Sequence, residues 1–154
     1  MTIRPATETD ASALVALTGQ LGYPVGDREF SQRLTRLLQR PDSSVWVAET
    51  IDGSVVGWIH AFVRPSLESE SSTEIGGLIV SNTARRQGIG RLLVGRVFDW
   101  AEEQRTPIVT VRCNVVRGDG QAFYEALSFS PVKVQQVWRR SSRRSEPAAR
   151  QSLP

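Results

Sequence analysis

Four side chains of the sequence have the chemistry to move a proton or an acyl group. Tyr124 carries a phenol, which with a reference pKa of about 10 can protonate a leaving thiolate, although the ring can also serve only as a packed aromatic. Glu74 opens an apolar run, where we expect its pKa to rise toward useful base strength; the alternative is a solvated glutamate at a strand end. His60 is the second candidate base, although a lone strand histidine is more often structural. Cys113 stands among β-branched residues, which predicts a small core residue rather than an acyl nucleophile.

A basic, glycine-rich corner at residues 85–90 follows the apolar run 75–80 and a polar turn. After the corner, apolar residues recur at helical spacing as far as Ala101. The first N–H groups of a helix lack internal partners and the helix dipole adds positive charge, so a strand that enters a helix through glycines forms a phosphate site. The corner is neither G-x-x-x-x-G-K-S/T nor G-x-G-x-x-G, because only Gly88 and Gly90 are present. An ordinary strand-to-helix corner is the alternative.

The pattern that fits this corner is Q/R-x-x-G-x-G, filled by Arg85, Gly88 and Gly90 directly after a predicted strand. It resembles the acyl-CoA pyrophosphate loop of the GNAT family of N-acetyltransferases, which implies acetyl-CoA as the acyl donor. Gly76-Gly77 predicts a bulge or splay in the strand. It would free a backbone N–H of residues 78–80 to donate to the oxyanion of the tetrahedral intermediate. The CoA arm can then pair with that strand as an added edge. The expected acetyl-CoA contacts are Leu78, Ile79, Val80, Arg85, Arg86, Gln87, Gly88, Ile89, Gly90, Arg117 and Tyr124.

A second stretch resembles another landmark of the family, Asn-x-x-Ala-x-x-Phe-Tyr-x-x-x-Gly-Phe, through Phe123, Tyr124 and Phe129. The resemblance then covers residues 2–139 and implies that Tyr124 is the acid for the thiolate. Glu74 lies eleven residues before Arg85, the offset at which the histone-acetyltransferase branch of the family carries its catalytic glutamate.

Three residues depart from the second landmark, namely Arg117 for Asn, Gly120 for Ala and Ser128 for Gly. Together they put the CoA contacts around Arg117 in doubt, although Arg117 can reach a phosphate instead. A left-handed helix cap at Ser128 would need a different conformation.

The elements are expected in the order β-α-α-β-β-β-α-β-α-β. Strands are predicted at residues 2–6, 44–51, 54–63, 75–80, 108–113 and 133–139, and helices at 7–20, 27–40, 89–101 and 118–127. Asp52-Gly53 predicts a hairpin turn and Gly57 a bulge. The three consecutive strands should be antiparallel, and residues 75–113 should form a right-handed parallel crossover. We therefore expect an α/β fold, with a mixed, mostly antiparallel central sheet and helices on both faces, which is the topology of the GNAT family.

Composition narrows the classes of function. The chain is 40% hydrophobic and 23% charged, which is typical of a soluble protein, and we expect neither a membrane span nor a secretory signal. A single cysteine excludes an internal disulfide and favours a cytoplasmic location. One histidine and one cysteine make a metal site built by the protein improbable, so we expect no metal.

The net charge of +3 belongs to the end of the chain. Residues 140–154 hold four of the 19 basic and one of the 16 acidic side chains, which leaves 15 of each sign in residues 1–139. We expect an acetyltransferase domain over residues 1–139, an Arg/Ser-rich disordered tail over residues 140–154, and no nucleic-acid partner.

The acceptor is expected to be a small amine. The resemblance implies that the segment 21–27 and the loop 65–72 build the acceptor pocket; Glu68 and Glu70 there would attract a cation, and Tyr23 would stack on it. This predicts a polyamine-like or aminoglycoside-like acceptor, with His60 close by and direct attack on acetyl-CoA in a ternary complex. The alternatives are a protein N-terminus or lysine as acceptor, an inactive CoA-binding sensor, and a glutamate loop without function. A homodimer stays open.

Overall fold

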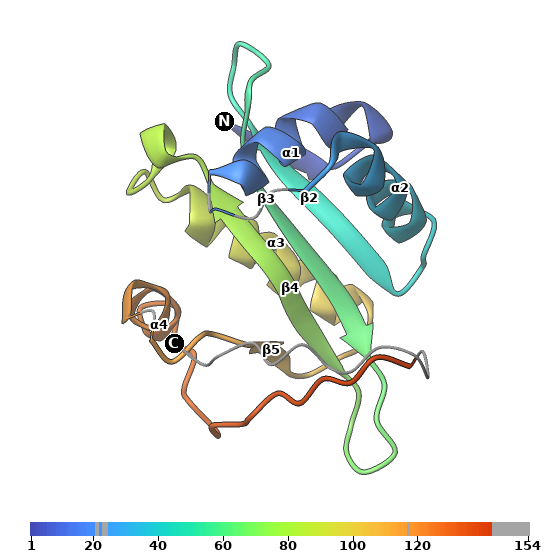
Figure 1. Cartoon of the computed structure of the whole chain (residues 1–154). Coiled ribbons are helices and arrows are strands. Elements are labelled where there is room, and N and C mark those ends of the chain that lie inside the picture. The colour runs from blue at the N-terminus through green and yellow to red at the C-terminus, as the bar shows by residue number, and fades with distance from the viewer. Residues whose placement is uncertain (21, 23–24, 117, 143–154) are drawn as a thin grey trace. The chain divides into compact units, whose positions relative to one another are not determined.

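The structure is a computed structural model, and it describes residues 1–20, 22, 25–116 and 118–142 (Figure 1). The chain divides into two units, residues 1–117 and 118–154, and each is described by itself. The tail predicted to be disordered lies outside the described residues except for residues 140–142.

The first unit is built on a sheet of five strands in the order β1-β2-β3-β4-β5. The strands are β1 (Thr2–Pro5), β2 (Ser43–Glu49), β3 (Val55–Arg64), β4 (Ser72–Val80) and β5 (Val109–Val111). Neighbours from β1 to β4 pair antiparallel, and β4 pairs with β5 in parallel. The mixed, mostly antiparallel sheet predicted from the sequence is therefore confirmed, and so is the parallel pairing across the crossover.

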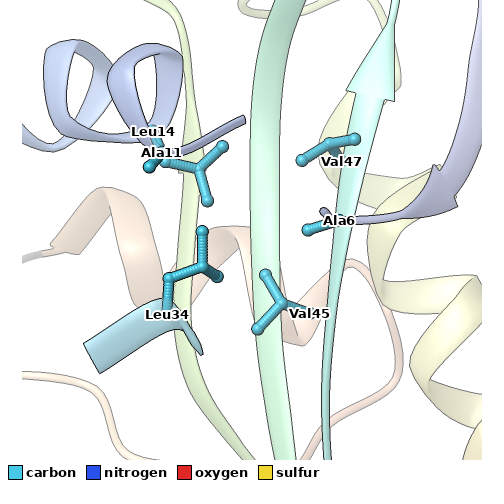
Figure 2. Packing of buried hydrophobic residues seen from close by; sticks show 6 residues of the cluster. All are labelled: Ala6, Ala11, Leu14, Leu34, Val45 and Val47. Atoms are coloured by element: carbon cyan, nitrogen blue, oxygen red, sulfur yellow. The ribbon is translucent and has the colours of Figure 1, made fainter. Parts of the chain in front are cut away.

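Two helices cover one face of this sheet. A short 3-10 helix, η1 (Glu8–Asp10), leads into α1 (Ala11–Gly19), and α2 is Asp27–Leu38. Their apolar stripes face inward, as helical spacing requires. Ala11 and Leu14 of α1 and Leu34 of α2 pack with Val45 and Val47 of β2, and Figure 2 shows this cluster from close by. The cluster packs α1 and α2 against this face of β2.

The opposite face is covered by α3 (Ile89–Glu103), the helix that follows the glycine-rich corner. The side chains of Leu93, Val94 and Val97 are fully buried there. The indole of Trp100 meets Trp46 of β2 edge-on, with ring centroids 5.6 Å apart. Because this helix is fixed along its whole buried stripe, its N-terminus has a fixed position at the end of β4.

The second unit contains α4 (Gly118–Glu125), which ends in a Schellman motif. The N–H of Phe129 donates to the carbonyl of Tyr124 at 3.0 Å, and the N–H of Ser128 donates to Glu125 at 2.9 Å. Ser128 has φ +66°, so the serine adopts the left-handed conformation that the family fills with glycine. The expectation that this cap would need another conformation is wrong.

The last predicted strand is also wrong. Residues 131–140 have no regular secondary structure, and Val134, Val137 and Trp138 are more than four-fifths exposed. The sequence alternates as a strand would, but alternation stabilises a strand only where a partner strand and a covering layer exist. The described part of its unit contains neither.

Candidate functional site

The two halves of β4 have different neighbours. In the first half, residues 73–75 lie between β3 and β5, because the pairing with β5 runs from Thr73 opposite Val109 to Ile75 opposite Val111. Residues 77–80 pair with β3 and with no other described strand. Beyond Ile75 the two parallel strands no longer pair, and one edge of β4 is left open.

A β-bulge marks the boundary between these halves. His60 of β3 stands opposite Gly77, whereas the next residue, Ala61, stands opposite Ile75, so Gly76 is the extra residue. A β-carbon on Gly76 would lie 2.8 Å from Nδ1 of His60. Glycine is therefore required here because the imidazole ring lies over its Cα. The bulge predicted at Gly76-Gly77 is confirmed; the register shift near Gly57 also agrees with its prediction.

The open edge of β4 presents backbone donors. N–H groups point to alternate sides along a strand, and the N–H of Ser81 donates to the carbonyl of Val56 on the β3 side at 2.8 Å. The N–H groups of Val80 and Leu78 must then point to the opposite side. Among the described strands, none pairs with β4 there, because the β5 ladder ends at Ile75. Two donors therefore face a position that an extended ligand can fill.

The glycine-rich corner lies at the end of this edge. A short 3-10 helix, η2 (Asn82–Ala84), leads to Gly88, which caps α3 at φ +76°. Arg86 is also left-handed at φ +61°, a conformation that costs a non-glycine residue about 1–2 kcal/mol and that collects at binding sites. The first internal bond of α3 runs from Leu92 N–H to Gly88, so the N–H groups of Ile89 and Gly90 have no acceptor within the helix.

The charge of this corner suits an anion. Residues 85–88 are exposed, two of them are arginines, and the first turn of α3 carries no acidic side chain. A phosphate placed there would meet N–H donors, the positive end of the helix dipole and guanidinium groups. Leu78 to Val80 and the corner thus form one continuous surface of donors.

Glu74 lies in the paired half of β4, where its environment differs from the expectation. The side chain is buried, but its carboxylate is not isolated among apolar groups. Arg112, just after β5, donates from Nε to one oxygen at 2.9 Å, and Arg64, at the end of β3, donates from Nη1 to the other at 3.2 Å. This ion cluster joins three strands at the point where β5 still pairs. Sequence reasoning missed Arg64 and Arg112, because only the sheet register brings them to Glu74.

His60 lies on the same face of the sheet, over the bulge. Its Nε2 is 3.1 Å from the hydroxyl of Ser43, which is buried at the start of β2. The ring also lies 5.5 Å from the ring of Phe62. Burial lowers the pKa of His60 below its ordinary value, which favours the neutral imidazole. Gly76 beneath it is exposed, so the surroundings of the bulge are open to a ligand.

The other predicted site residues fall in different places. Glu68 and Glu70 lie on the fully exposed loop between β3 and β4. Tyr124 is half-buried in the second unit, in edge-on contact with Phe123 at 5.0 Å and Phe129 at 5.4 Å. Tyr23 and Arg117 lie outside the described residues. The roles of all these residues stay predictions.

Cys113 corrects one expectation outright. The thiol follows β5 and is exposed rather than part of the core. β5 is shorter than predicted and ends at Val111, so the β-branched run before the cysteine does not carry it into the sheet.

Comparison with known proteins decides the family. The model of the acetyltransferase (GNAT) family matches residues 13–129. The chain belongs to this family. Aminoglycoside N(6′)-acetyltransferase type 1 of Serratia marcescens is 24% identical over 116 residues, which cover 72% of this chain and 80% of that protein. The protein of the same name from Klebsiella aerogenes is 30% identical over 107 residues, covering 64% of this chain and 69% of its own.

Solved structures share the fold. AAC(6′)-Iy in complex with the bisubstrate analogue CoA-S-monomethyl-acetylneamine aligns with a TM-score of 0.82 at 19% identity, over 91% of this chain and 97% of that one. This likeness shows the fold. Membership of the acetyltransferase (GNAT) family makes the chain an N-acetyltransferase with acetyl-CoA as its donor, as the sequence predicted. In the described residues, no helix is long and apolar enough to cross a membrane, and no three His, Cys, Asp or Glu side chains gather as metal ligands.

Proposed function

We propose that this acetyltransferase moves the acetyl group of acetyl-CoA to a primary amine of a small cationic molecule of the aminoglycoside or polyamine type. Attack is direct, in a ternary complex of both substrates. The binding of acetyl-CoA is supported chiefly by one observation: the open edge of β4 leads into the corner at Gly88, which has a left-handed backbone. The choice of acceptor is supported by the likeness to two aminoglycoside acetyltransferases and by the acidic loop at residues 65–72.

The donor lies along the unpaired half of β4 in this proposal. Its pantetheine arm pairs with residues 78–80 as an added strand would, and its pyrophosphate binds the N–H groups and arginines of residues 85–90. The thioester carbonyl then points its oxygen at a backbone N–H of Leu78 to Val80. That N–H stabilises the negative charge of the tetrahedral intermediate.

Proton transfer completes the reaction. The acceptor ammonium must lose a proton before its nitrogen can attack, so a base is required; Glu74 and His60 are the candidates. The CoA thiolate leaves more readily when it is protonated, and Tyr124 is proposed as that acid. Arg117 is proposed as a further phosphate contact.

The acceptor pocket is proposed to draw its charge from Glu68 and Glu70, with Tyr23 stacking on the acceptor. Both carboxylates are exposed, and neither forms an ion pair with another described residue. Glu74 carries a negative charge that two arginines already balance, so it adds little to the attraction. A protein N-terminus or lysine is the second candidate acceptor.

An acceptor screen tests this proposal. A thiol-release assay would compare polyamines, aminoglycosides, amino acids and peptides, using the wild type and Glu68→Gln/Glu70→Gln. We expect a polycationic acceptor to be best, with a KM that rises several-fold in the double variant and with added salt. Glu8→Gln/Glu102→Gln removes two exposed carboxylates elsewhere and should leave that KM unchanged. A best acceptor with no charge beyond its reacting amine would contradict the proposed class, and release of no thiol with any amine would favour the inactive sensor.

We further propose a cytoplasmic location, which the single cysteine supports because it needs no oxidising compartment. A homodimer is the remaining proposal. Light scattering on the purified chain checks it directly.

A further inference from the structure

The bulge at Gly76 brings two titratable side chains to one face of the sheet, and they differ in what they already bind. Both oxygens of Glu74 accept hydrogen bonds from arginines. His60 has one ring nitrogen bound to Ser43 and directs the other toward the bulge. We infer that His60 is the general base of this acetyltransferase, and that Ser43 is the residue that positions its ring. This inference rests on the proposed transfer to an amine.

Glu74 is poorly placed to take a proton. Both of its oxygens already accept hydrogen bonds from arginines, so a substrate ammonium could contact either oxygen only by displacing a guanidinium group. The cluster also lies on the side of the bulge where β5 still pairs with β4. We therefore assign Glu74 to holding β3, β4 and β5 together below the open edge.

The geometry of His60 fits a base at the bulge. If Nε2–H donates to the hydroxyl of Ser43, the lone pair of Nδ1 is available. Nδ1 lies 2.8 Å from the position of a β-carbon on Gly76, so this nitrogen is directed at the bulge rather than at the core. Ser43 is buried and fixed in β2, and it therefore holds the ring in one rotation.

The surroundings of the ring favour its neutral form. β2 contributes the Ser43 hydroxyl, β4 the backbone of Gly76, β3 the ring of Phe62, and α1 has no titratable side chain from Ala11 to Gly19. Glu74, on the same face, is balanced by its arginines. Burial alone lowers the pKa of His60, and no charged neighbour contributes to that shift.

The proton balance of the step is as follows. His60 Nδ1 takes one proton from the acceptor ammonium, and the free amine forms a C–N bond to the thioester carbonyl carbon. Collapse of the intermediate breaks the C–S bond, and the nitrogen loses its second proton. One proton ends on the CoA sulfur, and the one on His60 passes to solvent, which leaves an amide and free CoA.

The pH dependence has a definite sign. The imidazole must be neutral to accept a proton, so kcat/KM is full above the pKa of His60 and falls as the pH drops through it. We call this fall of kcat/KM at low pH the acidic limb. Because burial lowers the pKa of His60, the midpoint of the acidic limb should lie below the ordinary histidine value of about 6.5.

The wild-type protein provides the first test, since His60 is its only histidine. One set of imidazole NMR signals therefore reports the pKa of this residue in the free enzyme. The acidic limb of kcat/KM should have the same pKa, because that limb reports the free enzyme. A kinetic limb more than one pH unit away from the NMR value would overturn the assignment, whatever the variants do.

Variants give the second test. His60→Gln should lower kcat/KM at neutral pH by roughly 10²- to 10³-fold, abolish the acidic limb and leave acetyl-CoA binding unchanged by calorimetry. Ser43→Ala should lower kcat/KM several-fold and move the limb to lower pH, since the imidazolium loses an acceptor; Ser43→Thr should restore its position. Glu74→Gln should keep the limb.

Two results would contradict the inference: full activity of His60→Gln, or loss of the limb in Glu74→Gln only. If His60→Gln does not fold, His60→Ala assayed with added imidazole replaces it, and rescue by neutral imidazole is expected. If the wild type acetylates no amine, the proposed function itself is contradicted. That result can be told apart from failure of the His60 assignment, in which the wild type and His60→Gln are both active.

Discussion

Residues 72–75 and 76–80 belong to one strand, yet they have opposite relations to the rest of the molecule. In the first part, residues 73–75 pair on both sides and include Glu74, whose carboxylate is bound by two arginines. In the second part, Gly76 is the exposed bulge residue, residues 77–80 pair with β3, and the N–H groups of Leu78 and Val80 point to the side on which no described strand pairs with them. Figure 1 shows β4 leaving β5 and running toward the start of α3.

The difference shows how one strand serves both stability and binding. Backbone groups that are satisfied by neighbours stabilise the sheet and have nothing left for a ligand. Groups that face an open edge weaken the sheet but can pair with an extended molecule. The bulge at Gly76 separates the two uses, and the predictions below treat each half separately.

The largest effect is expected at the end of the unpaired half. Arg85→Ala/Gly88→Asp should weaken acetyl-CoA binding by roughly 10²- to 10³-fold, because one charge-assisted hydrogen bond is worth about 1.5–3 kcal/mol and a carboxylate would meet the phosphate. Isothermal calorimetry measures this. Arg36→Ala/Gly95→Asp makes the same changes at an exposed arginine and an uncrowded helix position, and should leave the affinity unchanged. Equal affinities for both double variants would remove the corner from the site.

The rate of acetyl transfer should depend on Tyr124 more strongly than the affinity for acetyl-CoA does. Tyr124→Phe keeps the ring and removes the hydroxyl group that would donate the proton, so kcat should fall roughly tenfold to a thousandfold, with little change in the affinity for acetyl-CoA. Steady-state kinetics and calorimetry on the same preparation separate the two quantities. A variant that loses stability but keeps its kcat per folded molecule would assign Tyr124 to packing alone.

A smaller effect is expected at the bulge itself. Gly76→Ala places a methyl group against Nδ1 of His60, so it should destabilise the fold by about 1–3 kcal/mol and lower kcat/KM about tenfold. Ile75→Val, one residue earlier in the paired half, should cost about 0.5–1.5 kcal/mol and leave kcat/KM unchanged. Chemical denaturation and initial rates measure both. If the two variants lose activity in proportion to stability, the bulge has no role of its own.

The smallest functional effect is expected at the ion cluster of the paired half. Glu74→Gln should lower the free energy of unfolding by about 1–2 kcal/mol, because two guanidinium groups lose their counter-ion at a partly exposed site. The affinity for acetyl-CoA should change less than about threefold, which is a difference of under 1 kcal/mol. Urea denaturation and calorimetry test this. A stable variant with a large loss of acetyl-CoA affinity would reverse the roles assigned to the two halves.

Much of the fold could be predicted from short patterns in the sequence. The glycine pair at 76–77 predicted the bulge because glycines inside a strand often mark a bulge. The structure adds the reason, since a β-carbon on Gly76 would meet the ring of His60. The hydrophobic stripes predicted the helices that cover the sheet, and the crossover predicted a parallel β5. Each of these features depends on a few neighbouring residues.

Features that depend on distant neighbours were not predicted. Arg64 and Arg112 meet Glu74 only through the register of three strands, so the sequence around Glu74 shows an isolated carboxylate. Ser128 is a local exception: bonds and a ring contact within residues 124–129 hold it in the left-handed conformation, although serine rarely adopts that conformation. The acceptor is least predictable, since side chains from several segments would define its pocket.

Amide hydrogen exchange along β4, with and without saturating acetyl-CoA, tests the central claim most directly. If the donor pairs with the open edge, the N–H groups of Leu78 and Val80 should become protected by at least tenfold. Those of Thr73 and Ile75, which already pair with β5, should change little. Unchanged exchange at Leu78 and Val80, or equal protection in both halves, would contradict the account.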